Sequence, residues 1–256
     1  MRCKVIWLIL LLALGACSVK ENRSECPCEL CIRPQEALAT DGNVFVSVIQ
    51  EGVVVKQGML SKEEFESGKC RMSVSRKPSV VTVFAGVTEM DLLRGRMLDI
   101  RDEHQCDAIY SCSRSASISD NVCEWEVDLH KNYTRLDLRI LNLPAGSSFS
   151  ISGSVQGYDL LDSQPYEGSF NCSRDGDVGK CSLRLPRQLD DGLSLAIQMP
   201  GYDTMTVPIG AMIANMGYSF EDEDLLDIAM TLDLQKASIS VSVTGWEEII
   251  LPVRID

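Results

Sequence analysis

Cysteine is the residue type that offers this sequence most of its chemistry. Among 256 residues there are 11 cysteines and only two histidines. Cys26, Cys28 and Cys31 form an N-terminal cysteine cluster, a grouping that can ligate a metal or form disulfides. The cluster lacks a second cysteine pair at zinc-site spacing, which argues against a metal. Disulfide bonding then depends on whether the chain leaves the reducing cytoplasm.

The first residues of the chain form a secretory signal. Two positive charges precede an unbroken apolar run from Val5 to Leu14. This pattern is typical of a signal peptide, because a membrane-spanning helix needs about 20 apolar residues. Residues 14–17, Leu-Gly-Ala-Cys, resemble the lipobox of bacterial lipoproteins. The resemblance implies that residues 1–16 are removed and that Cys17 receives a covalent diacylglycerol and an N-acyl lipid, which together anchor a protein stably. The alternative is an ordinary signal peptide followed by a chance cysteine.

Export favours disulfides over metal for the N-terminal cysteine cluster, because the envelope beyond the inner membrane is oxidising. Apart from Cys17 and the cysteine inside the signal peptide, nine cysteines remain. Nine is odd, so at least one thiol is unpaired or pairs between chains. Cys172 and Cys181 flank the turn-forming sequence Ser-Arg-Asp-Gly-Asp-Val-Gly-Lys. That spacing predicts a hairpin with a disulfide across it.

No catalytic motif accompanies these cysteines. His104 and His130 have no partner at a metal or triad spacing, and the sequence has no nucleophile elbow, zinc-protease motif or phosphate-binding glycine loop. Residues 171–182 match the first half of a calcium loop, but the twelfth position is Ser182 instead of Glu. The acidic run 221–224 is interpreted as a solvated loop. We therefore predict a protein that is not an enzyme, with no metal, no other cofactor and no small-molecule substrate.

The charge of the chain excludes one class of partner. The net charge is −13 for the full chain and becomes −15 when the two cations of the signal peptide are removed. Such an acidic protein is repelled by phosphate backbones, so we expect no nucleic-acid partner.

The rest of the sequence is dominated by alternation of apolar and polar residues, which is typical of β-strands. Asn43–Gln50 and Val53–Lys56 predict a hairpin, and Ser61 with Glu64 predicts a capping box at the start of a short helix that Gly68 ends. Further strand candidates are 79–87, 124–129, 136–140, 148–156, 182–185, 193–199, 204–209, 226–234 and 237–244. Many short strands separated by turns predict an all-β fold made of β-sandwiches with short helices.

A polar break at His130–Asn132 divides the strands into two groups. We expect residues 1–16 to form the lipoprotein signal peptide and 17–36 a lipid-anchored N-terminal segment. Residues 37–130 are then predicted to form an N-terminal β-sandwich domain, and residues 131–256 a C-terminal β-sandwich domain.

The last predicted strand has a clear apolar face. Ile239, Val241 and Val243 alternate on it, and Trp246 follows. One interpretation is a strand-exchange segment, because an extended segment can pair with an exposed sheet edge of another subunit. The other interpretation is that the segment completes its own domain.

One stretch of the sequence resembles a known family. Arg23–Leu30 (RSECPCEL), which follows the lipobox and a short polar spacer, is similar to the FimB/Mfa-type fimbrial anchor lipoproteins of Gram-negative anaerobes. The resemblance implies two tandem transthyretin-like β-sandwich domains, lipid anchorage and surface exposure at the outer membrane, and fimbrial subunits as partners that join by β-strand addition. Arg33 precedes Pro34, so no trypsin-like maturation site of polymerising pilins is evident, which fits a type V pilus anchor. The middle of the chain departs from the family in its number of cysteines.

The alternative function is a surface lipoprotein that binds glycan or host protein through sandwich loops. Carbohydrate platforms usually need exposed aromatic side chains. Beyond the signal peptide the chain has only two tryptophans, Trp125 and Trp246, and Trp125 falls on an alternating apolar face. The sequence therefore favours the assembly role.

Overall fold

The computed structural model describes most of the chain between residues 23 and 252. None of the helices among these residues is long and apolar enough to cross a membrane. Cys17 and Trp246, to which the sequence assigned lipid attachment and a place in the strand-exchange segment, lie outside the described residues. The described residues are 23–88, 93–94, 97–101, 103–118, 120–159, 163–175, 179–245 and 249–252.

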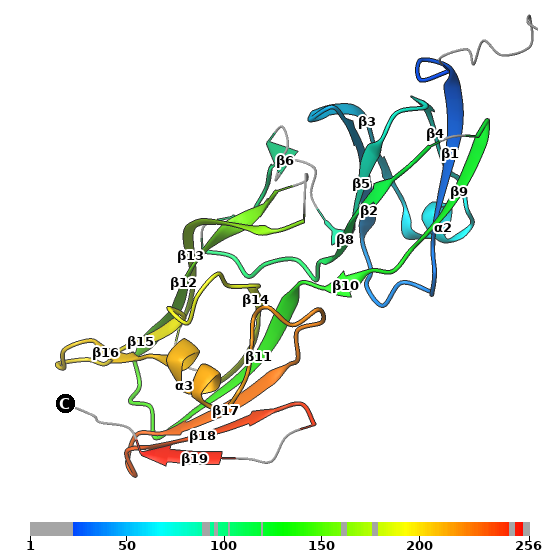
Figure 1. Ribbon diagram of the computed structural model, residues 1–256. Coiled ribbons are helices and arrows are strands. Elements are labelled where there is room, and N and C mark those ends of the chain that lie inside the picture. The colour runs from blue at the N-terminus through cyan, green and yellow to red at the C-terminus, as the bar shows by residue number, and fades with distance from the viewer. Residues whose placement is uncertain are drawn as a thin grey trace, which may run out of the picture.

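The first half of the chain forms a β-sandwich of two sheets (Figure 1). One sheet has the order β4-β1-β9, and the other has the order β10-β8-β5-β2-β3. The elements are β1 (Pro27–Pro34), β2 (Asn43–Gln50), β3 (Val53–Leu60), α2 (Lys62–Glu66), β4 (Cys70–Ser75), β5 (Ser79–Val87), β8 (Tyr110–Ala116), β9 (Val122–Val127) and β10 (His130–Lys131).

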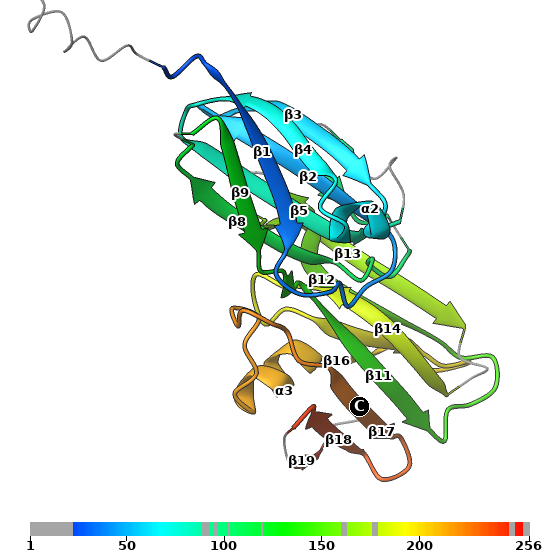
Figure 2. The ribbon, with the colours of Figure 1, turned by 90° about the vertical axis from the view of Figure 1, so that its right-hand side faces the viewer.

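A second sandwich, built from residues 93–94 and 97–99 and from the second half of the chain, follows the first end to end (Figures 1 and 2). Its sheets have the orders β14-β11-β17-β18-β19 and β16-β15-β12-β7-β6, and β13 pairs with the other side of β12. The elements are β6 (Leu93–Arg94), β7 (Met97–Asp99), β11 (Tyr133–Leu141), β12 (Ser148–Asp159), β13 (Pro165–Asp175), β14 (Lys180–Pro186), β15 (Ser194–Gln198), β16 (Met205–Val207), α3 (Ile209–Asn215), β17 (Ile228–Asp233), β18 (Ser238–Val243) and β19 (Ile249–Pro252). The prediction of an all-β sandwich fold with short helices is confirmed.

The two sandwiches share one strand topology. β1 pairs antiparallel with β4 and parallel with β9, just as β11 pairs antiparallel with β14 and parallel with β17. β2 lies between β3 and β5, and β12 lies between β13 and β15, with all four pairings antiparallel. β8 then extends the first of these sheets beyond β5, as β16 extends the second beyond β15. Among the described residues, no strand of the first sandwich corresponds to β18 or β19.

Local sequence signals explain several elements. The predicted first hairpin is confirmed: Glu51 and Gly52 have φ values of 53° and 77° in the β2–β3 turn, the left-handed conformation that tight hairpin turns require. The predicted capping box is also present, because Ser61 and Glu64 each bond the backbone N–H of the other. Gly68, with φ of 72°, follows the helix.

Two predicted local features differ from the structure. The hairpin between Cys172 and Cys181 is wrong, because β13 pairs with β12 in one sheet while β14 pairs with β11 in the other. The turn sequence carries the chain from one layer of the sandwich to the next instead of reversing it within a sheet. The second difference concerns the range 37–130 expected for the N-terminal domain. Strand β7 lies within this range but pairs with β12 of the C-terminal sandwich.

Candidate functional site

The predicted strand-exchange segment forms strand β18 at the far end of the C-terminal sandwich. Ile239, Val241 and Val243 are buried, with relative exposures of 0, 0 and 2%. Their strand pairs antiparallel with β17 from Ile228 to Asp233. Full burial of an aliphatic side chain contributes about 1.5–3 kcal/mol. In this structure Ile239, Val241 and Val243 therefore pack within their own domain, while a role of the segment in strand exchange stays a prediction.

Strand β19 forms the outer edge of the same sheet. It is four residues long and pairs only with β18 among the described residues. Ile249 and Ile250 are 41% and 71% exposed, whereas Leu251 packs against the core. An edge strand with exposed apolar side chains is a template for pairing with another chain.

The N-terminal cysteine cluster does not converge on one point. Cys28 is buried on the inner face of β1 with Leu30, while Cys31 occupies the opposite face. Side chains on opposite faces of a strand point away from each other, so the Cys28 and Cys31 thiols cannot bond to each other in this fold. On the inner face, the register of β1 with β9 places Cys123 beside Leu30. Burial raises the pKa of Cys28, and the nearby Cys123 thiol raises this pKa further.

The structure contains no disulfide among the described cysteines. Cys172 is buried in the C-terminal core, and Cys181 packs against that core from the other sheet. Disulfide bonding of Cys172, Cys181 and the N-terminal cysteine cluster, Cys26 included, stays a prediction. The residues described also contain no group of three or more His, Cys, Asp or Glu side chains arranged to hold a metal ion.

A separate apolar cluster joins the two sandwiches. Phe45, Phe84 and Ile109 come from the N-terminal half, and Leu98 and Tyr158 come from the sheet of the C-terminal half. The rings of Phe84 and Tyr158 lie 6.3 Å apart. Each of the five side chains is at most 3% exposed. The junction is thus packed as a core, which holds the two sandwiches in one arrangement.

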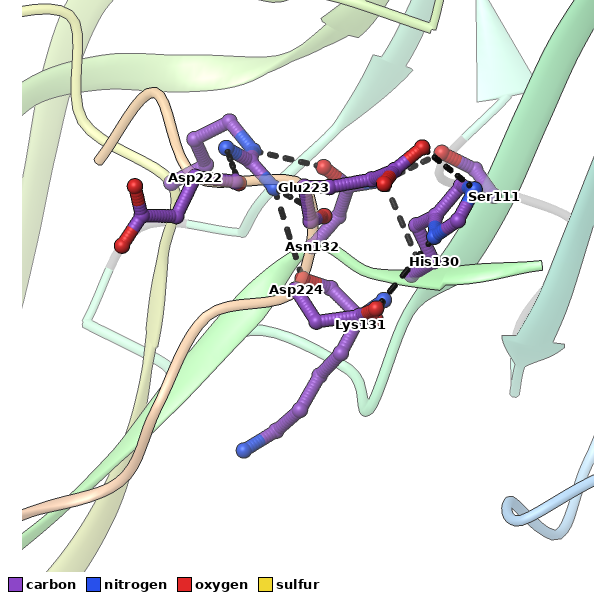
Figure 3. A network of polar contacts seen from close by, with 8 residues as sticks. Ser111, His130, Lys131, Asn132, Asp222, Glu223 and Asp224 are labelled. Atoms are coloured by element: carbon purple, nitrogen blue, oxygen red, sulfur yellow. Dashed lines mark hydrogen bonds and ion pairs between the residues drawn. The ribbon is translucent and has the colours of Figure 1, made fainter. Parts of the chain in front are cut away.

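Arg187 organises a polar network beside this cluster (Figure 3). Its guanidinium donates to the side-chain oxygen of Asn132 at 2.7 Å and to the backbone carbonyls of Phe220, Asp222 and Glu223. Its backbone N–H donates to the Tyr158 hydroxyl at 3.1 Å. The residue is only 8% exposed, and burial lowers the pKa of its guanidinium. The network binds the linker between the sandwiches to the loop that precedes β17.

The acidic run 221–224 has a structural role that its composition did not indicate. The sequence interpretation was a solvated loop, and the carboxylates of Glu223 and Asp224 are indeed 77% and 59% exposed. Its backbone carbonyls nevertheless bind Arg187, and the two carboxylates lie 3.1 and 3.3 Å from the ring nitrogens of His130. Because both ring nitrogens face carboxylates, His130 is not placed to activate a serine or cysteine.

Asp227 holds a second part of the same junction. Its carboxylate accepts from the Lys131 ammonium and from the backbone N–H of Arg135, and it lies 3.3 Å from the Arg135 guanidinium. Burial alone would raise the pKa of Asp227, but these hydrogen bonds and the two cations lower it below the ordinary value of 3.8.

This lowered pKa predicts a specific acid response. Asp227→Asn removes the stabilisation contributed by the ionised carboxylate, so the variant should melt below the wild type at neutral pH. A lowered native pKa contributes stability that is lost as the pH falls through it. The gap between the melting temperatures should therefore narrow as the pH drops below 3.8. Thermal unfolding of the wild type and the variant from pH 7 to pH 3 measures this gap in melting temperature. The control variant Glu36→Gln, at an exposed position, should show no such gap, and a gap that stays constant with pH would contradict the assignment.

A cleft opens at the end of the C-terminal sandwich that lies away from the junction. Its volume is about 710 Å³, and its lining includes Met199, Tyr202, Asp203, Met205 and Leu234. Tyr202 is 68% exposed. Only tryptophans were weighed as exposed aromatic groups from the sequence, so this tyrosine was missed, although the Pro-Gly turn before it indicated an exposed loop.

The comparisons with known proteins bear on the fold. No family model and no curated protein matches the sequence. Among solved structures, the fimbrial anchor protein Mfa2 from Porphyromonas gingivalis superposes with a TM-score of 0.60 and 11% identity, over 86% of this chain and 98% of that one.

Two further structures from Bacteroides are similar to the same extent. A Bacteroides thetaiotaomicron protein provisionally assigned to polysaccharide binding has a TM-score of 0.62 and 11% identity, over 89% of this chain and 98% of its own. A Bacteroides ovatus protein provisionally assigned as an adhesin has a TM-score of 0.56 and 13% identity, over 91% and 97%. This chain therefore shares its fold with the fimbrial anchor Mfa2 and with adhesin-like Bacteroides proteins, and the resemblance stated from the sequence is confirmed at the level of fold.

Proposed function

We propose that this chain is a non-catalytic outer-membrane lipoprotein that acts as the anchor or accessory subunit of a type V fimbria. Its lipid is attached at Cys17, and fimbrial subunits join it by β-strand addition. The first support is the shared fold with the fimbrial anchor Mfa2. The lipobox-like residues 14–17 supply the membrane attachment.

The position of β1 is the observation that carries the anchor role. A subunit that polymerises by giving up its first strand needs that strand to be removable. Here β1 is the central strand of its sheet, hydrogen-bonded to β4 on one side and to β9 on the other. Its residues Leu30 and Ile32 are fully buried, and its Arg33 is bound to Glu126 at 2.7 Å. A chain that retains this strand suits the terminal position of a fibre.

The geometry of the molecule also suits anchorage. Ten residues, 17–26, separate the proposed lipid from the first residue of β1, a length that spans at most about 35 Å when fully extended. The N-terminal sandwich then lies nearest the membrane. The C-terminal sandwich, fixed to it by the packed junction, extends outward (Figure 1).

Substitution of Cys17 tests this proposal. In a Cys17→Ala strain, filaments should appear in the medium or grow abnormally long, because the fibre has lost its lipid attachment. Electron microscopy of cells and spent medium, with fractionation to locate the protein, measures this. Cys3→Ala, in the signal peptide, is the matched control and should leave filaments on the cells. Filaments that stay on Cys17→Ala cells in normal number would refute the anchor role.

A second candidate function is glycan binding, and the exposed Tyr202 beside the 710 Å³ cleft favours it. An exposed aromatic ring is the usual platform for a sugar face. If this function holds, Tyr202→Ala should abolish saturable retention of the protein on a glycan array, whereas Tyr110→Phe, in the other sandwich, should not. Equal retention of the wild type and Tyr202→Ala would exclude the cleft as a glycan site.

A further inference from the structure

Strand β9 forms a free edge of the N-terminal sandwich. It pairs with β1 on one side, and no other strand of the described residues pairs with its outer side. The N–H groups of Glu29 and Gln35 donate to the carbonyls of Asn121 and Val127, each at 2.9 Å. Backbone groups along a strand alternate in direction. The residues between them, Val122, Glu124 and Glu126, therefore direct their N–H and C=O groups away from β1.

The equivalent strand in the second sandwich is covered. There β17 takes the place of β9, in parallel with β11, and β18 pairs along its outer side. The inward residues Ile228, Met230 and Leu232 of β17 are consequently 2, 2 and 0% exposed. The inward residues Cys123 and Trp125 of β9 are only partly buried. Among the described residues, the N-terminal sandwich thus has no strand in the position that β18 occupies in the C-terminal sandwich.

We propose that the outer edge of β9 is the acceptor for an extended segment of a fimbrial subunit, which pairs antiparallel with β9 as β18 does with β17. This inference rests on the proposed fimbrial function and names the docking surface within it. The added strand satisfies the outward N–H and C=O groups of β9 and completes the burial of Cys123 and Trp125.

Strands β3 and β19, which form two other edges, are weaker candidates. Strand β3 is also exposed, with Val53 63% exposed, but its pairing with β2 contains a bulge, and its counterpart β13 also carries no added strand. Strand β19 includes Pro252 among its described residues, 249–252. Proline on an edge strand lacks a backbone donor and is a common protection against strand pairing.

The side chains of β9 define the chemistry of the partner. Residues directly opposite on neighbouring antiparallel strands contact each other on the same face. Aliphatic residues of the partner would lie beside Cys123 and Trp125 on the inner face. On the outer face, the alternate residues of the partner would lie beside Glu124 and Glu126, of which Glu126 already binds Arg33. The expected segment therefore alternates β-branched or aliphatic residues with Lys or Arg.

Site-specific photocrosslinking in the full-length chain tests the docking edge. Benzoylphenylalanine in place of Val122, which is 53% exposed on β9, should form a covalent adduct with a fimbrial subunit on fimbriated cells. The same group in place of Val53, on the β3 edge, is the control and should form none. Adducts from Val53 but not from Val122 would overturn the β9 edge and leave the fimbrial function standing. Adducts from neither position would overturn it as well, and the Cys17→Ala experiment would then decide whether the fimbrial function survives.

A backbone variant provides the second readout. Glu124→Pro removes an outward N–H without removing a β1–β9 hydrogen bond, and proline is tolerated at edge positions of this kind. The number of filaments retained on cells should fall about tenfold or more. The variant loses one backbone hydrogen bond to the added strand, and the proline ring prevents that strand from approaching closely. Glu124→Ala keeps the N–H and should retain filaments. Normal retention by a correctly exported Glu124→Pro protein would contradict the proposal.

Discussion

Arg187→Met is expected to destabilise the protein by about 3 kcal/mol, because it removes the donor that several buried or half-buried oxygens share. The guanidinium binds Asn132 and three carbonyls of the loop 220–223. Methionine fills a similar volume but donates no hydrogen bond, so these acceptors lose their partner in a half-buried region. A polar group left unsatisfied costs more than the hydrogen bond contributed.

Chemical denaturation of the purified chain measures this effect. Arg139→Met is the matched control, because Arg139 lies on the exposed face of β11, and its replacement should change the stability by no more than about 0.5 kcal/mol. Loss of the network should also loosen the junction, so protease cleavage near residue 130 should become faster in Arg187→Met. Stability equal to that of the Arg139→Met protein would mean that the network contributes little.

Ile239→Ala is expected to cost about 3 kcal/mol, within the range measured for the truncation of buried aliphatic side chains. Ile239 is fully buried and pairs with Leu232 of β17 in the centre of the C-terminal core. This cost would show that β18 completes its own domain in solution. If β18 were instead held out for donation to another subunit, truncation would leave the isolated protein almost unchanged.

The control for Ile239→Ala comes from the adjacent strand. Ile250 in β19 has the same side chain but is 71% exposed, so Ile250→Ala should shift the midpoint of urea unfolding by an amount equivalent to less than about 0.5 kcal/mol. A similar loss of stability in both variants would contradict the burial difference on which the assignment of β18 depends.

Local patterns allowed much of the fold to be predicted from the sequence. Alternation places Val46 and Val48 of β2 on one buried face, and it does the same for Val81 and Val83 of β5. The capping box at Ser61 depends on residues three apart, which contact each other whatever the rest of the chain does. Such signals are short-range, so one sequence is enough to read them.

Features that depend on long-range pairing could not be predicted. The sequence between Cys172 and Cys181 has the composition of a hairpin turn. Whether the chain reverses within one sheet or crosses to the other depends on pairing with β11 and β12, which lie tens of residues away. The role of Arg187 likewise depends on carbonyls 33 to 36 residues later in the chain. Carbonyl groups are present at every residue, so the sequence carries no signal for such a site.

The measurement that tests the anchor role most directly is antibody–gold labelling of this chain on intact fimbriated cells, viewed by electron microscopy. An anchor at the end of each fibre should place gold at the cell-proximal end of the filaments and none along the shafts. In the Cys17→Ala strain the label should remain at one end of the released filaments. Gold distributed along the shafts, or on the cell surface apart from every filament, would contradict the anchor role.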